Sequence, residues 1–258
     1  MRNKRVTRKS KSTSYRETNT RSIYETKANY NSQLTEFQPV SSKIQTTKFI
    51  KPLNPRQRDY VKLIKEKTVV LCEGSPGTAK TLLALHTSIC LLNDESSPIE
   101  KIFYIRANVG ISEETSIGML PGTLQEKIIP LAYPVLDSLI NFMSEGNAKY
   151  LIENSKIEVL PISMVRGRSF ANSIVIVDEC ANCSPNTILT LLTRVGENSK
   201  MLLLGNSKQK DTVATIKDGL KDAIQRLQDL PQVGIVIFKD EDIVRNSVIK
   251  DILAKYQT

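Results

Sequence analysis

From residue 51 onward, short apolar runs alternate with longer segments in which apolar positions recur at helical spacing. The runs predict strands at Thr68–Cys72, Lys101–Arg106, Lys156–Leu160, Ser173–Val177, Lys200–Leu204 and Val233–Phe238. The longer segments predict helices at about 55–66, 80–92, 122–143, 185–195, 215–229 and 243–256. This alternation is typical of an α/β fold in which a parallel sheet is covered by helices on both faces.

Residues 1–50 show no such period and are rich in Ser, Thr, Asn, Lys and Arg. They hold 11 of the 36 Lys and Arg residues and 3 of the 27 Asp and Glu residues, which gives a net charge of +8. The remaining residues hold 25 basic and 24 acidic residues, a net charge of +1. Such a segment cannot bury enough apolar surface to offset its ordering entropy. We therefore predict a disordered basic tail at residues 1–50 and one folded domain at 51–258.

Aromatic residues are interleaved with the basic residues of this tail. They are Tyr15, Tyr24, Tyr30 and Phe37. The combination suits base stacking and phosphate contact on RNA or single-stranded DNA, and a solubilising tail is an equally open interpretation.

Composition also narrows the class of protein. No apolar stretch follows the N-terminal charges, and the longest nearly apolar segment, Leu82–Leu92, is too short to cross a bilayer, so we expect a cytoplasmic protein with no membrane partner. The single histidine, His86, excludes most Ser/His and Cys/His hydrolases, and it is expected to be packed rather than catalytic. Cys180 and Cys183 form a CxxC without a second pair at zinc-ligand spacing, which favours structural thiols.

The segment from Cys72 to Thr81 reads Cys-Glu-Gly-Ser-Pro-Gly-Thr-Ala-Lys-Thr and stands between a predicted strand and a predicted helix. This order is typical of a phosphate-binding loop, in which Lys80 reaches the β- and γ-phosphates of ATP and Thr81 ligates Mg²⁺. The predicted nucleotide-binding residues of the loop are Gly74, Ser75, Pro76, Gly77, Thr78, Ala79, Lys80 and Thr81. Ala79 replaces the usual glycine, so an ordinary strand-to-helix turn remains the alternative.

A second signal lies about a hundred residues further on. The apolar run Ser173–Val177 ends in Asp178 and Glu179, which is typical of a Walker B strand. Asp178 would hold Mg²⁺ through water, and Glu179 would orient and deprotonate the attacking water. A strand ending in two carboxylates is common by itself, but this order and spacing relative to the loop make coincidence improbable.

With both motifs placed, the chain from about Asn54 onward resembles the PhoH-like proteins, which are RecA-like P-loop ATPases related to superfamily 1 helicases. Further family-like stretches are Ser116-Ile-Gly-Met-Leu-Pro-Gly122, Met164-Val-Arg-Gly-Arg168, Asp178-Glu-Cys-Ala-Asn182, Leu192-Thr-Arg-Val-Gly196 and Asp240-Glu-Asp-Ile-Val-Arg245. Each is weak by itself, and together, in this order, they are specific.

The resemblance implies roles for further residues. Gln57 is similar to the glutamine that reads adenine in related helicases, and a surface glutamine is the alternative. Gln209 resembles the residue that senses the γ-phosphate or the attacking water. Asn206 stands where the family usually has Asp, which puts metal-linked roles there in doubt.

Phosphoryl transfer needs positive charge near the transition state, and the resemblance implies which arginines supply it. Arg245 and Arg194 are the candidate arginine fingers, and a helix-end cation is the alternative for Arg194. One RecA-like domain implies that a finger acts on a neighbouring subunit, which predicts a homo-oligomer, most simply a ring such as a hexamer. Three further arginines stand where related helicases contact the nucleic-acid backbone, although pairing roles remain open for them. They are Arg106, Arg166 and Arg168.

The sequence therefore predicts an enzyme that binds and hydrolyses ATP with Mg²⁺ and couples hydrolysis to binding or remodelling of RNA or single-stranded DNA. An ATP-gated oligomeric binding protein with little turnover is the alternative, favoured by Ala79 and Asn206 and disfavoured by the retention of Glu179. A P-loop kinase is a third and weaker possibility.

Overall fold

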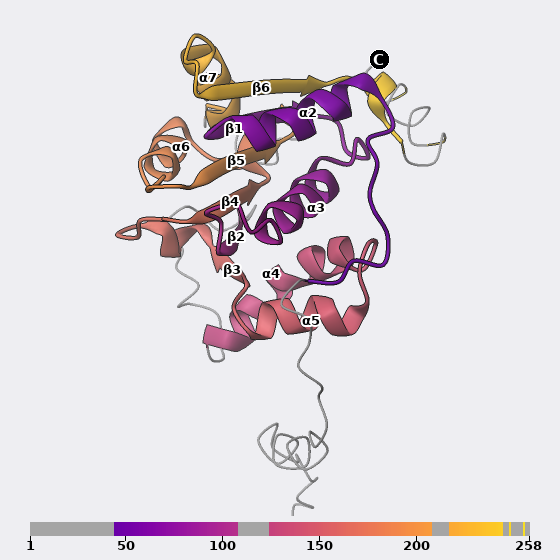
Figure 1. The fold of residues 1–258 in the computed structure, drawn as a ribbon. Coiled ribbons are helices and arrows are strands. Elements are labelled where there is room, and N and C mark those ends of the chain that lie inside the picture. Colours follow the sequence, from indigo (N-terminus) through magenta and orange to yellow (C-terminus); the bar gives the residue numbers. More distant parts are fainter. Residues whose placement is uncertain (1–43, 108–123, 208–216, 245–247, 249–254, 256–258) are drawn as a thin grey trace, which may run out of the picture. The chain divides into compact units, whose positions relative to one another are not determined.

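The computed structural model describes residues 44–107, 124–207, 217–244, 248 and 255. Its centre is a six-stranded sheet in which all neighbouring strands are parallel, in the order β3-β2-β4-β5-β1-β6 (Figure 1). The strands are β1 (Val69–Gly74), β2 (Lys101–Arg106), β3 (Ile157–Pro161), β4 (Ser173–Asp178), β5 (Lys200–Gly205) and β6 (Val233–Phe238). One strand, β5, separates β1 from β4, so the phosphate-binding loop and the Walker B carboxylates do not lie on adjacent strands.

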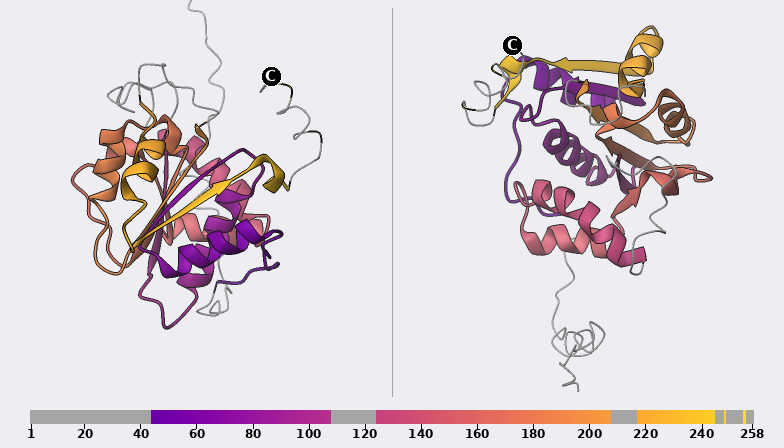
Figure 2. Two further views of the ribbon diagram at one scale, coloured as in Figure 1. Left: turned by 90° about the horizontal axis from the view of Figure 1, so that it is seen from above. Right: turned by 180° about the vertical axis from the view of Figure 1, so that it is seen from behind.

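Helices cover both faces of the sheet (Figures 1 and 2). One face carries α2 (Pro55–Glu66), α3 (Lys80–Leu92), α4 (Leu124–Leu139) and α5 (Glu145–Glu153), and the other carries α6 (Pro185–Leu192) and α7 (Gly219–Leu227). Alternate strand residues enter the two cores: in β1, Val70 and Cys72 pack under α2 and α3, while Leu71 faces α6 and α7. Because both faces are buried, the strands are nearly continuous apolar runs, as the sequence shows.

The predicted strands are all present, and the predicted helices differ mainly at their ends. The single helix predicted at 122–143 is two helices in the described residues, because α4 ends at Leu139 and Ser144 caps a separate α5 by accepting a hydrogen bond from the Asn147 N–H. Most of the helix predicted at 243–256 lies outside the described residues, and Ile243 is extended.

The boundary of the tail is also different. Residues 44–50, assigned above to a disordered tail, are part of the folded domain: Asn93 exchanges two hydrogen bonds of 2.8 Å with the backbone of Ile44, and the Ile50 N–H donates to His86 Nε2 at 3.2 Å. His86 is buried between the rings of Phe49 and Phe142, so its predicted packing role is confirmed. Residues 1–43 lie outside the described residues.

Within the described ranges, no helix is long and apolar enough to cross a membrane.

Candidate nucleotide-binding site

The loop between β1 and α3 has the backbone of an anion-binding turn. Gly74 approaches β6 so closely that a Cβ there would lie 2.4 Å from the Phe238 Cβ, and Gly77 has a positive φ of 85°. Ala79, with φ 65° and ψ 24°, is left-handed at the position where a glycine is usual. No side chain caps the start of α3, which leaves its first N–H groups available to a phosphate.

Lys80 lies folded over this turn. Its Nζ donates to the carbonyl oxygens of Gly74 at 2.6 Å and Ser75 at 2.9 Å. Burial lowers the pKa of the Lys80 ammonium, an effect that the nearby acidic groups oppose. The ammonium is therefore held by carbonyl oxygens of the loop itself, and phosphate oxygens are stronger acceptors that can replace them.

Thr81, at the start of α3, meets Asp178, at the end of β4. The Thr81 hydroxyl donates to Asp178 Oδ2 at 2.9 Å, although the two residues are 97 positions apart. A hydroxyl and a carboxylate beside a phosphate-binding loop are the hard oxygen ligands that suit Mg²⁺. Asp178 Oδ2 also accepts a hydrogen bond of 2.8 Å from the hydroxyl of Tyr104, a buried residue of β2 that our sequence reasoning missed.

Glu179 follows Asp178 in a left-handed conformation, with φ 61° and ψ 33°. Its Oε1 accepts two hydrogen bonds from Arg106, one from Nε at 3.1 Å and one from Nη2. Although burial lowers the pKa of Arg106, the hydrogen bond and the charge of Glu179 outweigh it, so this pKa is raised. The residue predicted to activate water is therefore engaged by a cation from the neighbouring strand.

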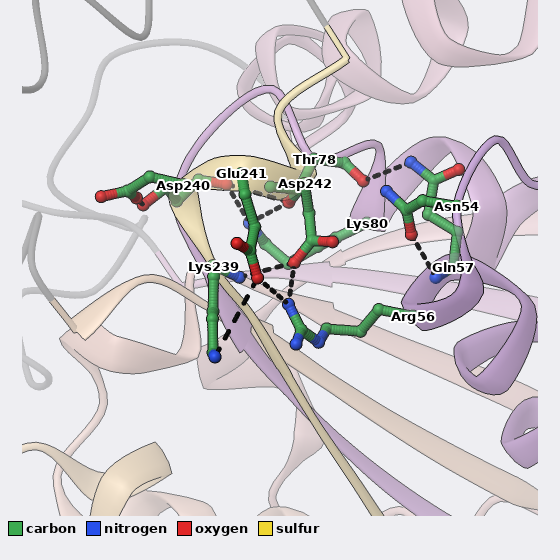
Figure 3. A network of polar contacts seen from close by, with 10 residues as sticks. Asn54, Arg56, Gln57, Thr78, Lys80, Lys239, Asp240, Glu241 and Asp242 are labelled. Carbon is green, nitrogen blue, oxygen red and sulfur yellow. Dashed lines mark hydrogen bonds and ion pairs between the residues drawn. The ribbon is translucent and has the colours of Figure 1, made fainter.

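The segment after β6 contacts the phosphate-binding loop directly (Figure 3). The Ser75 hydroxyl donates to Asp240, and the Val244 N–H donates to the Gly77 carbonyl at 3.0 Å. Asp242 pairs with Arg56 at the start of α2. The Asp240-Glu-Asp-Ile-Val stretch thus closes one side of the loop.

Gln57 lies on the other side of the loop and is almost fully buried. Its Nε2 donates to the Thr78 carbonyl at 3.2 Å (Figure 3), and its Oε1 accepts a hydrogen bond of 2.7 Å from the Leu53 N–H. The structure therefore brings Gln57 to the loop. Its contact with adenine stays a prediction, because the amide oxygen already has a backbone partner.

The structure does not bring Arg194 to this site. The Arg194 carbonyl accepts a hydrogen bond from the N–H of Phe170, which precedes β4, so Arg194 lies at the opposite end of the strands from the phosphate-binding loop. A finger role for Arg194 is thus possible only toward another subunit. Gln209 and Arg245 lie outside the described residues, as does the Ser116–Gly122 stretch.

The sheet order, the loop at the end of β1 and the carboxylates at the end of β4 define a P-loop nucleotide-binding domain of RecA-like fold. The family model described as PhoH-like protein matches residues 49–257, and the chain belongs to this family.

Named relatives support this assignment. The chain is 36% identical over 203 residues to a PhoH-like protein of Synechocystis sp., covering 78% of this chain and 60% of that protein. It is 33% identical over 200 residues to one of Bacillus subtilis, covering 78% and 61%, and 32% identical over 206 residues to Protein PhoH of Escherichia coli, covering 79% and 57%. The chain thus spans about 60% of the length of these relatives.

Two solved structures give weaker likenesses. The large terminase of a thermophilic bacteriophage matches at a TM-score of 0.47 with 15% identity, over 80% of this chain and 49% of that one. The Pif1 helicase of Candida albicans matches at a TM-score of 0.41 with 11% identity, over 80% and 44%.

Proposed function

We propose that this domain binds Mg·ATP and hydrolyses it, and that hydrolysis is coupled to binding or remodelling of RNA or single-stranded DNA. The observation that carries the proposal is the 2.9 Å contact between Thr81 and Asp178, because it joins the phosphate-binding loop to the Walker B strand. The hydroxyl of Thr81, the carboxylate of Asp178 and the folded-back Lys80 thus lie together at one loop, as binding of Mg·ATP requires. Bound Mg²⁺ would neutralise charge on the phosphates, held by Thr81 and, through water, Asp178.

The residues of this chain would act as follows. The N–H groups of the loop and of the start of α3 bind the phosphates, and Lys80 exchanges its carbonyl partners for phosphate oxygens. Glu179 accepts the proton of the attacking water. Arg245 follows Val244, which contacts the loop, whereas Arg194 could act only on a neighbour's nucleotide, which is compatible with a ring-shaped homo-oligomer.

The nucleic-acid half of the proposal rests on the basic, aromatic-containing N-terminal segment and on the arginines at the end of β2 and after β3. An ATP-gated binding protein with little turnover is the second candidate. One observation favours it: Arg106 engages Glu179 in this structure, so the carboxylate that would act as the base is not free.

The test is steady-state ATP hydrolysis by the intact chain and by Glu179→Gln, each with and without single-stranded RNA and DNA. Loss of turnover in the variant, with stimulation of the native chain by one nucleic acid, supports the proposal and names the nucleic acid. Binding of ATP by both proteins with no turnover under any condition favours the gated binding protein instead.

A further inference from the structure

The residues at the ends of β2 and β4 form a second layer of contacts around the site. β2 and β4 are adjacent, and Arg106 is paired in register with Asp178. Two positions of β2 that point to the same side contact the two Walker B residues: Tyr104 donates to Asp178, and Arg106 donates twice to Glu179. The strand thus supplies a hydroxyl to the metal-binding carboxylate and a cation to the carboxylate that would activate water.

The Arg106–Glu179 pair has the geometry of a reversible contact. The side chains are 32% and 35% exposed, so a ligand can approach both, and ion pairs of this exposure contribute little to stability. The planar fork of an arginine also fits a phosphate as well as it fits a carboxylate. A phosphate group that arrives here can therefore replace Glu179 without leaving the guanidinium unpaired.

The backbone supports this interpretation. Glu179 is in the left-handed region, which costs a non-glycine residue about 1–2 kcal/mol, and such strained residues cluster at functional sites. The Glu179 N–H also donates to Asp178 Oδ1 at 2.9 Å, so the main chain at this residue is fixed, while Arg106 is the cation that its side chain contacts among the described residues. Release from Arg106 would therefore move the carboxylate by rotation of its side chain alone.

Resting on the function proposed above, we infer that Arg106 is a positioning residue that holds Glu179 away from its catalytic position until a phosphate group competes for the guanidinium. The phosphate comes either from a bound single-stranded nucleic acid or from the γ-phosphate of the nucleotide. The competition predicts that Glu179 weakens the binding of that ligand, because each must displace the other from Arg106.

The test is a double-mutant cycle in binding, with the full chain as wild type, Glu179→Gln, Arg106→Gln and the double variant. The ligands are a single-stranded RNA or DNA oligonucleotide in one arm and a non-hydrolysable ATP analogue with Mg²⁺ in the other. Glu179→Gln is expected to tighten binding about three- to fivefold in one arm, as is typical of one partly exposed charge pair, and to have no effect in the Arg106→Gln background. The arm that responds identifies the source of the phosphate.

Two further variants make the result specific. Arg226→Gln removes another surface arginine that is paired with a carboxylate, on α7, and it is expected to leave the effect of Glu179→Gln unchanged. Arg106→Lys keeps the charge and should restore part of the coupling, which keeps the test valid if Arg106→Gln folds poorly. In the oligonucleotide arm, Arg106→Gln should also reduce the salt slope of binding by about one unit.

The inference is overturned if Glu179→Gln changes neither affinity, or if it changes an affinity equally in the presence and absence of Arg106. Because the cycle measures binding, it is independent of turnover. If binding shows coupling but none of the four proteins hydrolyses ATP, the proposed ATPase activity is refuted and the competition at Arg106 is upheld. If the wild type hydrolyses ATP but the two substitutions act additively on binding, the ATPase activity is upheld and the competition is refuted.

Discussion

Ala79 provides a direct test of how the phosphate-binding loop tolerates its departure from the usual glycine. Its left-handed backbone costs an alanine about 1–2 kcal/mol, and Ala79→Gly removes this strain. The glycine also gains freedom in the unfolded chain, which costs about 0.4–1 kcal/mol. We therefore expect Ala79→Gly to raise the free energy of unfolding by about 0–1.5 kcal/mol.

The matched control is Ala132→Gly in the interior of α4, where the same atoms are removed from a half-buried alanine in right-handed helical conformation. There the glycine is expected to cost about 1 kcal/mol. Urea unfolding followed by circular dichroism, with equal slopes for the variants, measures both changes. If Ala79→Gly destabilises the protein as much as Ala132→Gly does, the argument that the loop is strained at Ala79 is wrong.

Three further predictions concern packing, the metal site and pH. Gly205→Ala should cost about 1–3 kcal/mol in unfolding experiments, because its Cβ would lie 2.7–2.8 Å from α7 and from the turn after β4, whereas Gly146→Ala meets nothing within 4 Å and should be neutral or stabilising. Tyr104→Phe should weaken Mg²⁺-dependent nucleotide binding about tenfold in titrations and leave binding in EDTA unchanged. Burial lowers the pKa of His86, so the unfolded chain binds its proton more strongly and stability should fall as the pH drops below about 6.5. His86 is the only histidine in the sequence, and its neutral ring accepts a hydrogen bond from the Ile50 N–H. His86→Gln should therefore remove the loss of stability between about pH 7.5 and 5.5. An unchanged loss of stability in this variant would contradict the assignment of the pH dependence to His86.

Much of the fold could be predicted because its determinants are local. Each strand is a nearly continuous apolar run, the central strands β4 and β5 are buried on both faces, and the loop from Gly74 to Thr81 is recognisable by residue type and spacing. The break between α4 and α5 was missed because the segment keeps its apolar period across Ser144, whose capping role depends on one hydrogen bond to a backbone N–H. Residues 44–50 were assigned to the tail on composition, which does not reveal that Asn93 and His86 provide hydrogen-bond partners for their backbone.

The residues of the candidate site also differ in how far the sequence could predict them. Thr81 and Asp178 could be predicted because each belongs to a motif whose position on a strand or helix is fixed by the local pattern. Tyr104 and Arg106 could not be assigned their partners, because their contacts depend on β2 being the neighbour of β4, and strand order is a property of the whole sheet. The available signal is the two-residue spacing of Tyr104 and Arg106 on β2. This spacing places both side chains on the same face of the sheet, close to its carboxyl-terminal edge.

The resting contacts of Lys80 and Glu179 have a common physical logic. Two charged side chains that the proposed ATP hydrolysis would use are paired inside the described part of the protein, Lys80 with loop carbonyls and Glu179 with Arg106. The carbonyl contacts satisfy the largely buried ammonium of Lys80, which would be costly to leave unpaired, whereas the more exposed Arg106–Glu179 pair contributes little to stability. In the competition proposed above, phosphate oxygens replace the acceptors in both pairs, so binding exchanges partners instead of creating new charges, and the arrival of a phosphate would release Glu179 from Arg106.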